Sequence, residues 1–319
     1  MIGFPLNDII ESQQFDRSLL DTVFQTADRM KADLIGQRRY AKSLDGKIMA
    51  SLFYEPSTRT RFSFESAMLR LGGSVITTEN AREFSSAAKG ESLADSTRIM
   101  NGYADVIVMR HNEAGSASKA AEISDVPVIN AGDGAGQHPT QALLDVYTIV
   151  DAFSGIDSLK IAMVGDLRYG RTVRSLAYLL TKYENVEIIF VSPSVCKMEG
   201  DIKAYLDRYN VPWREEDDLA AIVPEVDCVY MTRIQKERFH SLEDYEAAAG
   251  KYILTRKRVQ TMNANAIIMH PLPRVDEIAA DVDDDPRARY FQQAQNGLYV
   301  RMALLYLLLN PDDQDDGKQ

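Results

Sequence analysis

The stretch that decides the fold is residues 47–78, "KIMASLFYEPSTRTRFSFESAMLRLGGSVITT". It predicts a strand over 47–53, a helix over 58–71 and a second strand over 74–78, because an apolar run, a helical spacing and another β-rich run follow one another. Two strands joined by a helix lie parallel in one sheet. The same stretch places three hydroxyls and two arginines within residues 57–61, where the helix begins.

Strands and helices continue to alternate beyond this unit. Apolar runs such as "IAMV", "IIFV" and "AIIM" predict strands covered on both faces, which is typical of parallel sheets wrapped by helices. The fold class is therefore α/β, with two doubly wound parallel-sheet domains. Further helices are expected over 16–35, 90–102, 171–183 and 198–209 and from Pro139 onward, and further strands over 104–110, 159–164, 186–191, 227–232 and 266–269.

The composition is that of a soluble globular protein with room for two domains: 319 residues, 45% of them hydrophobic and 26% charged. Lys and Arg number 36 against 47 Asp and Glu, a formal charge of -11, which disfavours nucleic acid or an anionic membrane as the partner of the whole surface. Cys196 and Cys228 lack a CxxC spacing, so neither a zinc site nor a disulfide framework is expected.

The chain shows no pattern of a membrane span or a leader. No apolar stretch approaches the roughly 20 residues that a span requires. The start "MIGFPLNDIIESQQFDRSLL" resembles neither a signal nor a transit peptide. We therefore expect a cytoplasmic protein, or a chain that has already been processed.

The helix start "PSTRTR" is a candidate phosphate site. Helix N-termini present unpaired backbone N–H groups and a partial positive charge, and both attract phosphate. The motif lacks the Gly-Lys-Ser/Thr ending of a nucleotide P-loop. The alternative is a well-capped amphipathic helix with surface arginines, and Arg61 receives no ligand role. As a cradle, the motif would use the hydroxyls of Ser57, Thr58 and Thr60 and the charge of Arg59.

Polar or cationic residues also follow directly after four further apolar strands. In parallel α/β sheets ligands bind beyond the carboxyl ends of the strands, so these residues could converge on one crevice. For any one of them a solvated loop residue is the alternative, but the recurrence in both halves favours a site. They are Arg110 in "DVIVMRH", His138 and Gln141 in "NAGDGAGQHPTQ", Arg171 in "AMVGDLRYGRT", and Arg233 and Gln235 in "CVYMTRIQ".

Three loops carry weaker signals. "HPLPR" at 270–274 has two X-Pro bonds, and a cis Leu272–Pro273 bond could direct backbone carbonyls into a site, with a plain extended loop as the alternative. "REFSSAAKGES" at 82–92 reads either as a lid that brings Lys89 to a bound phosphate or as a simple exposed loop. "VGDLRYGRT" lacks the GxGxxG spacing, which disfavours a nicotinamide-dependent dehydrogenase.

Six motifs together resemble the aspartate carbamoyltransferases of the transcarbamoylase family over residues 5–310. They are "FYEPSTRTR", "VMRH", "HPTQALLD", "VGDLRYGRTVRSL", "MTRIQKER" and "MHPLPRVDEI". The resemblance implies a first domain, 1–151 completed by C-terminal helices 292–319, that binds carbamoyl phosphate. It implies a second domain, 152–291, that binds aspartate, with the active site between the two. The implied reaction carbamoylates the amine of L-aspartate, an early step of de novo pyrimidine biosynthesis, without a metal or other cofactor.

The resemblance also assigns individual residues to the two substrates. The residues that it assigns to carbamoyl phosphate are Ser57, Thr58, Arg59, Thr60, Arg110, His138 and Gln141. It also assigns Ser85 and Lys89 to carbamoyl phosphate, as residues that reach the site of a neighbouring subunit. This arrangement implies a homotrimer with shared active sites. On aspartate it places Arg171, Arg233 and Gln235 against the carboxylates, Lys89, and Leu272, whose backbone carbonyl accepts from the amine.

The implied mechanism needs no covalent nucleophile. The amine of aspartate attacks the carbamoyl carbon, Thr60, Arg110 and His138 stabilise the developing oxyanion, and phosphate leaves into the cradle that contains Arg59. Neighbouring cations should keep His138 neutral, so that it donates a hydrogen bond rather than acting as a general acid. The two substrates bring roughly four negative charges to the cationic residues of the motifs.

The segment "TTENAREFSSAAKGES" resembles the plant-type enzymes, which implies a free trimer inhibited by UMP at the active site and makes the plastid stroma an alternative location. Ala88 stands where some bacterial members carry a second lysine. One alternative is an ornithine or other amino-acid carbamoyltransferase, disfavoured by "HPLP" in place of "HCLP" and by Arg233 with Gln235. Another is an inactive transcarbamoylase-like binding module, disfavoured because every phosphate and carbamoyl ligand is retained.

Overall fold

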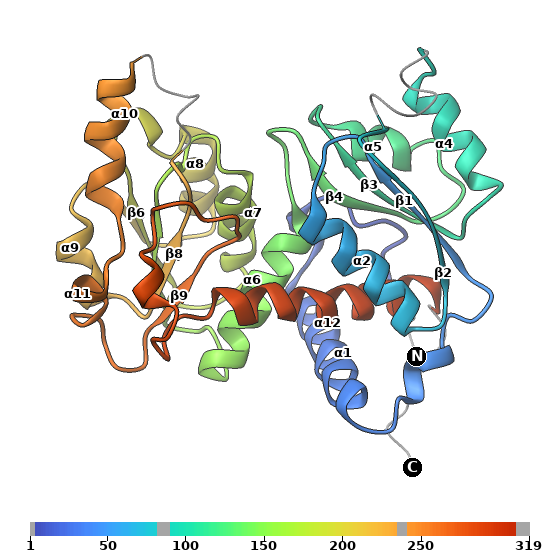
Figure 1. Ribbon diagram of the computed structural model, residues 1–319, viewed down its shortest axis with the longest axis horizontal. Helices are drawn as coiled ribbons and strands as arrows, with labels where there is room; N and C mark the ends of the chain where they lie inside the picture. The colour runs from blue at the N-terminus through green and yellow to red at the C-terminus, as the bar shows by residue number, and fades with distance from the viewer. Residues whose placement is uncertain (1–3, 82–89, 235–240, 311–319) are drawn as a thin grey trace. The chain divides into compact units, whose positions relative to one another are not determined.

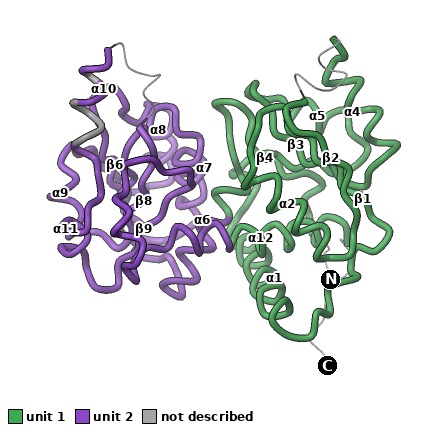
Figure 2. The backbone as a smooth tube through the Cα atoms, viewed as in Figure 1, with its two compact units in different colours: residues 1–143, 296–319 green, residues 144–295 purple. Residues whose placement is uncertain are grey.

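The computed structural model describes residues 4–81, 90–234 and 241–310, and it contains two units that are each built on one parallel sheet (Figures 1 and 2). Unit 1 comprises residues 1–143 and 296–319, and unit 2 comprises residues 144–295. Both boundaries fall inside a helix, α6 (Pro139–Phe153) and α12 (Tyr290–Leu309). The chain therefore leaves unit 1 along α6 and returns to it along α12, and the predicted α/β class with two parallel sheets is confirmed.

The sheet of unit 1 has the order β2-β1-β3-β4. Its strands are β1 (Ile48–Phe53), β2 (Ser74–Glu79), β3 (Val106–His111) and β4 (Val128–Asp133), and every neighbouring pair is parallel. The chain runs from β1 outward to β2 and then crosses back to β3 on the other side of β1. The strand order therefore reverses between β1 and β3, where parallel sheets offer a binding crevice at the carboxyl ends.

Helices cover both faces of this sheet, as Figure 1 shows. On one face, Ala50 and Leu52 of β1 belong to a buried cluster that also receives side chains from α4 (Leu93–Asn101) and α5 (Ser116–Ala121). On the opposite face, the hydroxyl of Ser51 donates to Glu65 of α2 (Thr58–Arg70) at 3.1 Å. Successive strand residues point to opposite faces, so α2 lies across the sheet from α4 and α5. Unit 1 also contains α1 (Arg17–Ile35).

The sheet of unit 2 has the order β7-β6-β5-β8-β9, again with parallel neighbours throughout. Here the order reverses between β5 and β8. The strands are β5 (Lys160–Val164), β6 (Glu187–Val191), β7 (Trp213–Glu216), β8 (Cys228–Met231) and β9 (Ile267–Met269). The helices are α7 (Arg171–Leu180), α8 (Gly200–Arg208), α9 (Leu219–Ile222), α10 (Leu242–Ala249) and α11 (Arg256–Val259).

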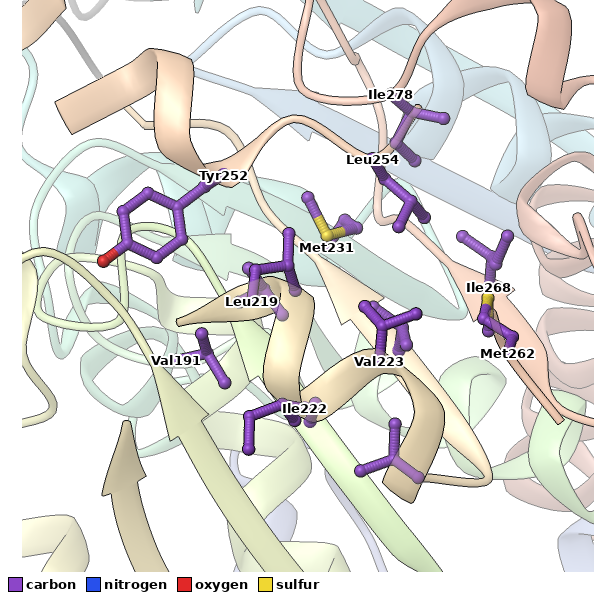
Figure 3. Close-up of a cluster of buried hydrophobic side chains, with 14 of the residues drawn as sticks. Val191, Leu219, Ile222, Val223, Met231, Tyr252, Leu254, Met262, Ile268 and Ile278 are labelled. Atoms are coloured by element: carbon purple, nitrogen blue, oxygen red, sulfur yellow. The ribbon is translucent and has the colours of Figure 1, made fainter. Parts of the chain in front are cut away.

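One face of this sheet carries the hydrophobic cluster drawn in Figure 3. Val191, Met231 and Ile268 project from three strands onto Leu219 and Val223, which belong to α9 and the turn after it. On the opposite face, the hydroxyl of Tyr230 donates to Asp145 of α6 at 2.7 Å. Because both faces are covered, β5, β6, β8 and β9 carry continuous apolar runs, as the sequence predicted.

The predicted helices and strands lie where expected to within a few residues, but some elements were not predicted. β7 was missed because its sequence "WREE" is polar and its residues are only half-buried at the edge of the sheet. The strand β4 was missed because it runs directly into the glycines of the following loop. The helices α5, α9, α10 and α11 were missed because none exceeds 8 residues, which is too short for a periodic pattern.

Candidate functional site

The start of α2 lacks the side-chain cap that α1 and α4 have. Asp16 accepts from the N–H of Leu19 at the start of α1, and Ser92 accepts from the N–H of Asp95 at the start of α4. Ser57 occupies the same position before α2 but forms no such bond within the described residues. The expectation of a merely well-capped helix is therefore wrong. The first N–H groups of α2 therefore receive no hydrogen bond from the side chain of Ser57.

Arg59 and Thr60 follow in the first turn of α2 and differ in burial. Thr60 is 8% exposed, whereas Arg59 is exposed to solvent. Desolvation by the surrounding protein lowers the pKa of the Arg59 guanidinium from its ordinary value. Arginine nonetheless stays protonated at neutral pH, so Arg59 adds a full positive charge to the helix start.

Arg61, which the sequence left without a role, braces α2 against the sheet. Its Nη2 atom lies 3.0 Å from Glu79 Oε2 on β2, and its Nε atom lies 3.9 Å from Glu65 Oε1 on the helix itself. The same Glu65 oxygen accepts from the hydroxyls of Ser51 on β1 and Thr77 on β2, at 3.1 and 2.6 Å. Arg61 therefore ties the helix to β2, and Glu65 links the same helix to β1 and β2.

Arg110 is the penultimate residue of β3 and lies beside the end of β1. It pairs in register with Phe53, and the N–H of Tyr54 donates to its carbonyl at 2.8 Å. The guanidinium is 9% exposed and lies 3.0 Å from Glu55 Oε2. Its Nη1 also donates to the carbonyl of Ala131 on β4 at 3.4 Å. Arg110 thus lies near the carboxyl end of β3, one of the two strands between which the order of the sheet reverses.

His138 and Gln141 lie at the start of α6, after a loop that Asp133 organises. Both side chains are buried, with 4% and 9% exposure. The carboxylate of Asp133 accepts from the N–H groups of Gly115 and Gln137 at 2.8 and 2.9 Å. Gly134 has a φ of 50°, and a Cβ at this position would lie 2.5 Å from the carbonyl oxygen of Asn112. Only glycine fits there, and its turn brings His138 to the carboxyl end of the sheet.

In unit 2 the corresponding reversal lies between β5 and β8. Gly165 follows β5 with a φ of 113°, and a Cβ there would lie 2.3 Å from the carbonyl oxygen of Thr232 after β8. The N–H of Thr232 donates to the carbonyl of Val164 at 2.8 Å. This close approach holds the two strand ends together. Arg171 then begins α7 after Gly170, which provides no side-chain cap.

Arg171 is half-buried, and Arg233, two residues after β8, is exposed. Both therefore follow the strands on either side of the reversal, at the carboxyl ends, as the sequence predicted. Gln235, Ser85 and Lys89, the remaining predicted contacts, lie outside the described residues.

Leu272 belongs to the loop after β9, and the predicted cis Leu272–Pro273 bond is present. Arg274 in the same loop pairs with both carboxylate oxygens of Asp283, and its guanidinium lies 5.1 Å from the ring centroid of Tyr290. His270 and Glu277, at the two ends of the loop, form a buried contact of 2.6 Å. The loop is therefore held by side chains on both sides of Leu272.

Several residues that support the site were not singled out in the sequence. Glu55 lies inside the quoted motif "FYEPSTRTR", but nothing local shows that its carboxylate pairs with Arg110. Asp133 is the last residue of β4, and its charge alone gave no sign of a structural role. Among the described residues, no group of three His, Cys, Asp or Glu side chains is arranged to hold a metal ion. No helix in the described ranges is sufficiently long and apolar for a membrane crossing.

Two family models match the chain. The first, described as the carbamoyl-P binding domain of aspartate/ornithine carbamoyltransferase, matches residues 7–151. The second, the Asp/Orn binding domain of the same family, matches residues 157–308. Together they span nearly the whole of both units.

Similar proteins carry the same description. The chloroplastic aspartate carbamoyltransferase of Oryza sativa subsp. japonica is 59% identical over 309 residues, which cover 95% of this chain and 85% of the relative. The catalytic subunit of Methanocaldococcus jannaschii aspartate transcarbamoylase superposes with a TM-score of 0.90 at 48% identity, covering 97% of this chain and all of the other. Trypanosoma cruzi aspartate transcarbamoylase in complex with N-(phosphonacetyl)-L-aspartic acid gives a TM-score of 0.89 at 38% identity, with 95% of each chain covered.

Proposed function

The chain belongs to the aspartate/ornithine carbamoyltransferase family, and from this premise we propose how its own residues carry out the aspartate reaction. Its activity is that of an aspartate carbamoyltransferase, and it binds carbamoyl phosphate and aspartate. The reaction moves the carbamoyl group of carbamoyl phosphate to the amine of L-aspartate and gives N-carbamoyl-L-aspartate and phosphate. The observation that carries the residue assignment is that both sheets present cationic residues at the point where their strand order reverses.

In unit 1 we assign the phosphate to the uncapped start of α2. Ser57, Thr58 and Thr60 provide hydroxyls and backbone N–H groups, and Arg59 provides the charge. Arg110, His138 and Gln141 take the carbamoyl oxygen and nitrogen. All three are at least 90% buried, so their hydrogen bonds to a ligand act in a medium of low dielectric constant.

In unit 2 we assign the two carboxylates of aspartate to Arg171, Arg233 and Gln235. A guanidinium binds a carboxylate with two parallel hydrogen bonds, which suits a dicarboxylate and not the ammonium group of ornithine. Leu272 accepts from the attacking amine through its backbone carbonyl. Ser85 and Lys89 complete the proposed set as residues contributed to a neighbouring subunit's site.

The mechanism follows from these assignments. The amine of aspartate, in its neutral form, attacks the carbamoyl carbon, and negative charge develops on the carbamoyl oxygen. Thr60, Arg110 and His138 donate to that oxygen and lower the barrier. The bond between the carbamoyl carbon and the phosphate oxygen then breaks, and phosphate departs onto the start of α2 with the proton that the amine loses. His138 donates a hydrogen bond and keeps its proton throughout.

The experiment that tests the assignment measures N-carbamoyl-L-aspartate formed from carbamoyl phosphate with aspartate or ornithine as acceptor. Aspartate should react and ornithine should not. Arg59→Ala should lose most of the activity with an unchanged circular dichroism spectrum, because the leaving phosphate loses its cation. Arg70→Ala is the matched control, since Arg70 is an exposed arginine at the other end of the same helix.

Full activity of Arg59→Ala would remove the phosphate cradle from the mechanism. A carbamoylated product from ornithine would instead favour the alternative activity within the family. A wild-type chain that binds carbamoyl phosphate but forms no product with either acceptor would point to a binding module.

We also propose a homotrimer with shared active sites and inhibition by UMP. Shared sites predict that a mixture of Lys89→Ala and Arg59→Ala chains, each inactive alone, regains activity after dissociation and reassembly. UMP should raise the melting temperature of the chain at millimolar concentration. No activity in the mixture excludes shared sites, and no shift with UMP excludes that inhibitor.

The domain limits and the location remain proposals as well. We assign residues 1–151 with 292–319 to carbamoyl phosphate and residues 152–291 to aspartate, and expression of each part with a ligand-binding assay tests this division. The plant relatives are named as chloroplastic, which supports the plastid over the cytoplasm. Fractionation of the source cells with an antibody against the chain distinguishes the two locations.

A further inference from the structure

The buried contact between His270 and Glu277 admits one arrangement of protons. His270 Nδ1 lies 2.8 Å from the backbone nitrogen of Leu272, and a backbone N–H can only donate. Nδ1 must therefore be the unprotonated ring nitrogen. The proton of the neutral ring is then on Nε2, which lies 2.6 Å from Glu277 Oε1 and donates to it. The tautomer of His270 is thus set by its two neighbours.

The carboxylate of Glu277 acts only as a hydrogen-bond acceptor. It is 6% exposed, and its Oε2 atom accepts from the N–H groups of Val275 and Asp276 at 3.0 and 3.1 Å. Burial favours the neutral acid, but the hydrogen bonds from His270 and the backbone outweigh it, so the pKa of Glu277 is lowered. An ionised carboxylate with three donors around it keeps the proton of His270 on Nε2.

His270 is itself held in place by a chain of buried polar groups within unit 2. Its backbone N–H donates to Gln293 Oε1 at 2.8 Å, and Gln293 Nε2 donates to Asp145 Oδ1 at 2.6 Å. The other oxygen of Asp145 accepts from the hydroxyl of Tyr230 at 2.7 Å. The backbone at His270, directly after β9, is therefore held in place, and so is the point from which the ring projects.

Leu272 needs such support because its backbone is strained. It has a φ of 54°, in the left-handed region, which costs a non-glycine residue roughly 1–2 kcal/mol. Its N–H is bound by the ring of His270. Among the described residues, no donor reaches the carbonyl oxygen of Leu272. The ring thus holds the peptide at Leu272 from its N–H side and leaves its carbonyl available.

We propose that His270 and Glu277 are positioning residues for aspartate, and that they act through the tautomer of His270. Glu277 keeps the proton on Nε2, Nδ1 accepts from the N–H of Leu272, and the carbonyl of Leu272 is thereby presented to the substrate amine. The inference rests on the proposed role of Leu272 in amine binding, and it adds two residues that contact neither substrate.

Glu277→Gln is the decisive variant. The carboxamide must turn its oxygen toward the N–H groups of Val275 and Asp276, so its NH2 group faces His270 Nε2. Nε2 then has to accept, the proton moves to Nδ1, and Nδ1–H opposes the N–H of Leu272. The KM for aspartate should rise about tenfold, as for one lost hydrogen bond, while the Kd of carbamoyl phosphate stays within about twofold.

The asparagine variant of His270 provides a rescue. In His270→Asn the amide oxygen takes the place of Nδ1 and accepts from Leu272 without help from Glu277, so the KM for aspartate should stay within about threefold of wild type. His270→Asn combined with Glu277→Gln should have a lower KM than Glu277→Gln alone. His270→Gln, whose amide replaces Nε2 and leaves Leu272 without an acceptor, should behave like Glu277→Gln.

A role in packing alone predicts the opposite order, with the double variant worse than either single variant, and that result would overturn the proposal. So would a wild-type KM in Glu277→Gln.

Asp285→Asn is the control for the loss of an ion pair in unit 2, since Asp285 Oδ1 lies 2.8 Å from Arg287 Nε outside the loop. If wild-type chain failed to carbamoylate aspartate, the proposed function would fall. If it reacts normally and Glu277→Gln has no effect, this inference alone is wrong.

Discussion

The two units present their ligand residues with different degrees of burial, although both do so where the strand order reverses. In unit 1, Thr60, Arg110, His138 and Gln141 are all 9% exposed or less. In unit 2, Arg171 is half-buried and Arg233 is exposed. The residues that we assign to the carbamoyl group in unit 1 are therefore desolvated, whereas Arg59 at the start of α2 is exposed. Unit 2 uses groups that still contact water before the substrate binds.

Because of this difference in burial, we assign stabilisation of the transition state to the buried residues of unit 1 and binding of aspartate to the more exposed residues of unit 2. A buried donor acts at low dielectric constant and needs no rearrangement when charge develops during the reaction. An exposed arginine gains less from a carboxylate because water competes for both. We therefore expect damage to unit 1 to lower kcat and damage to unit 2 to raise the KM for aspartate.

Arg110→Gln should have the largest effect. The loss of one donor to a developing oxyanion lowers kcat by about 10²–10³-fold. The Kd of carbamoyl phosphate, measured by calorimetry, should change far less. Arg110→Lys keeps the charge but not the two-pronged geometry and should be intermediate. A variant with normal kcat and only a raised KM would abolish the distinction between the units.

Arg233→Ala should raise the KM for aspartate by about 30-fold, which corresponds to about 2 kcal/mol for a charge-assisted contact. Neither the kcat at saturating aspartate nor the Kd of carbamoyl phosphate should change more than about threefold. Steady-state kinetics with each substrate varied in turn gives both values. A fall in kcat as large as that of Arg110→Gln would mean that Arg233 acts in the transition state.

Glu277 should contribute stability that depends on pH. Its pKa is lowered in the folded chain, so the unfolded chain binds the proton at higher pH than the folded chain does. Its contribution is complete above the unfolded value near 4.3 and is lost as the pH falls through the lower folded value. Urea unfolding between about pH 3.3 and about pH 5.3, roughly one unit either side of that value, should show a smaller loss of stability at acid pH in Glu277→Gln than in the wild type. If the free energy of unfolding fell equally with decreasing pH in the wild type and in Glu277→Gln, a pH-dependent contribution of Glu277 would be excluded.

Arg61→Glu should have the smallest effect, because the ion pair with Glu79 is partly exposed and contributes about 0.5–1 kcal/mol. The affinity for phosphate should fall a few-fold as the helix start loosens. Glu79→Arg in the same chain should restore part of it. A loss as large as that of Arg59→Ala would instead make Arg61 a ligand of phosphate.

Much of the fold could be predicted because its signals are local. Apolar runs marked the buried strands, and Pro139 marked the first residue of α6. The polar edge strand β7 gave no such signal, since a strand that is half-buried on both faces needs neither an apolar run nor an alternating pattern. Short helices were missed for a similar reason, because one turn is too brief to establish a period.

In the candidate site, too, some residues could be predicted from local signals and others could not. Residue type and position after a strand were enough to single out Arg110, His138, Arg171 and Arg233. The partner of Arg110 was not predictable, because Glu55 lies 55 positions away from it in the sequence. Distance along the chain carries no information about which carboxylate a given arginine will meet.

Local chemistry therefore accounts for the parallel sheets, the anion-seeking start of α2 and the cationic strand ends, since each depends on a few consecutive residues. Long-range packing decided the rest. It left Ser57 free of a capping bond in the described chain, paired Arg61, which the sequence left without a role, with Glu79 on β2, and set the tautomer of His270 through Glu277 and Leu272. The reason is that hydrogen bonds and ion pairs depend on distances of a few ångströms, which exist only after strands far apart in the chain have come together.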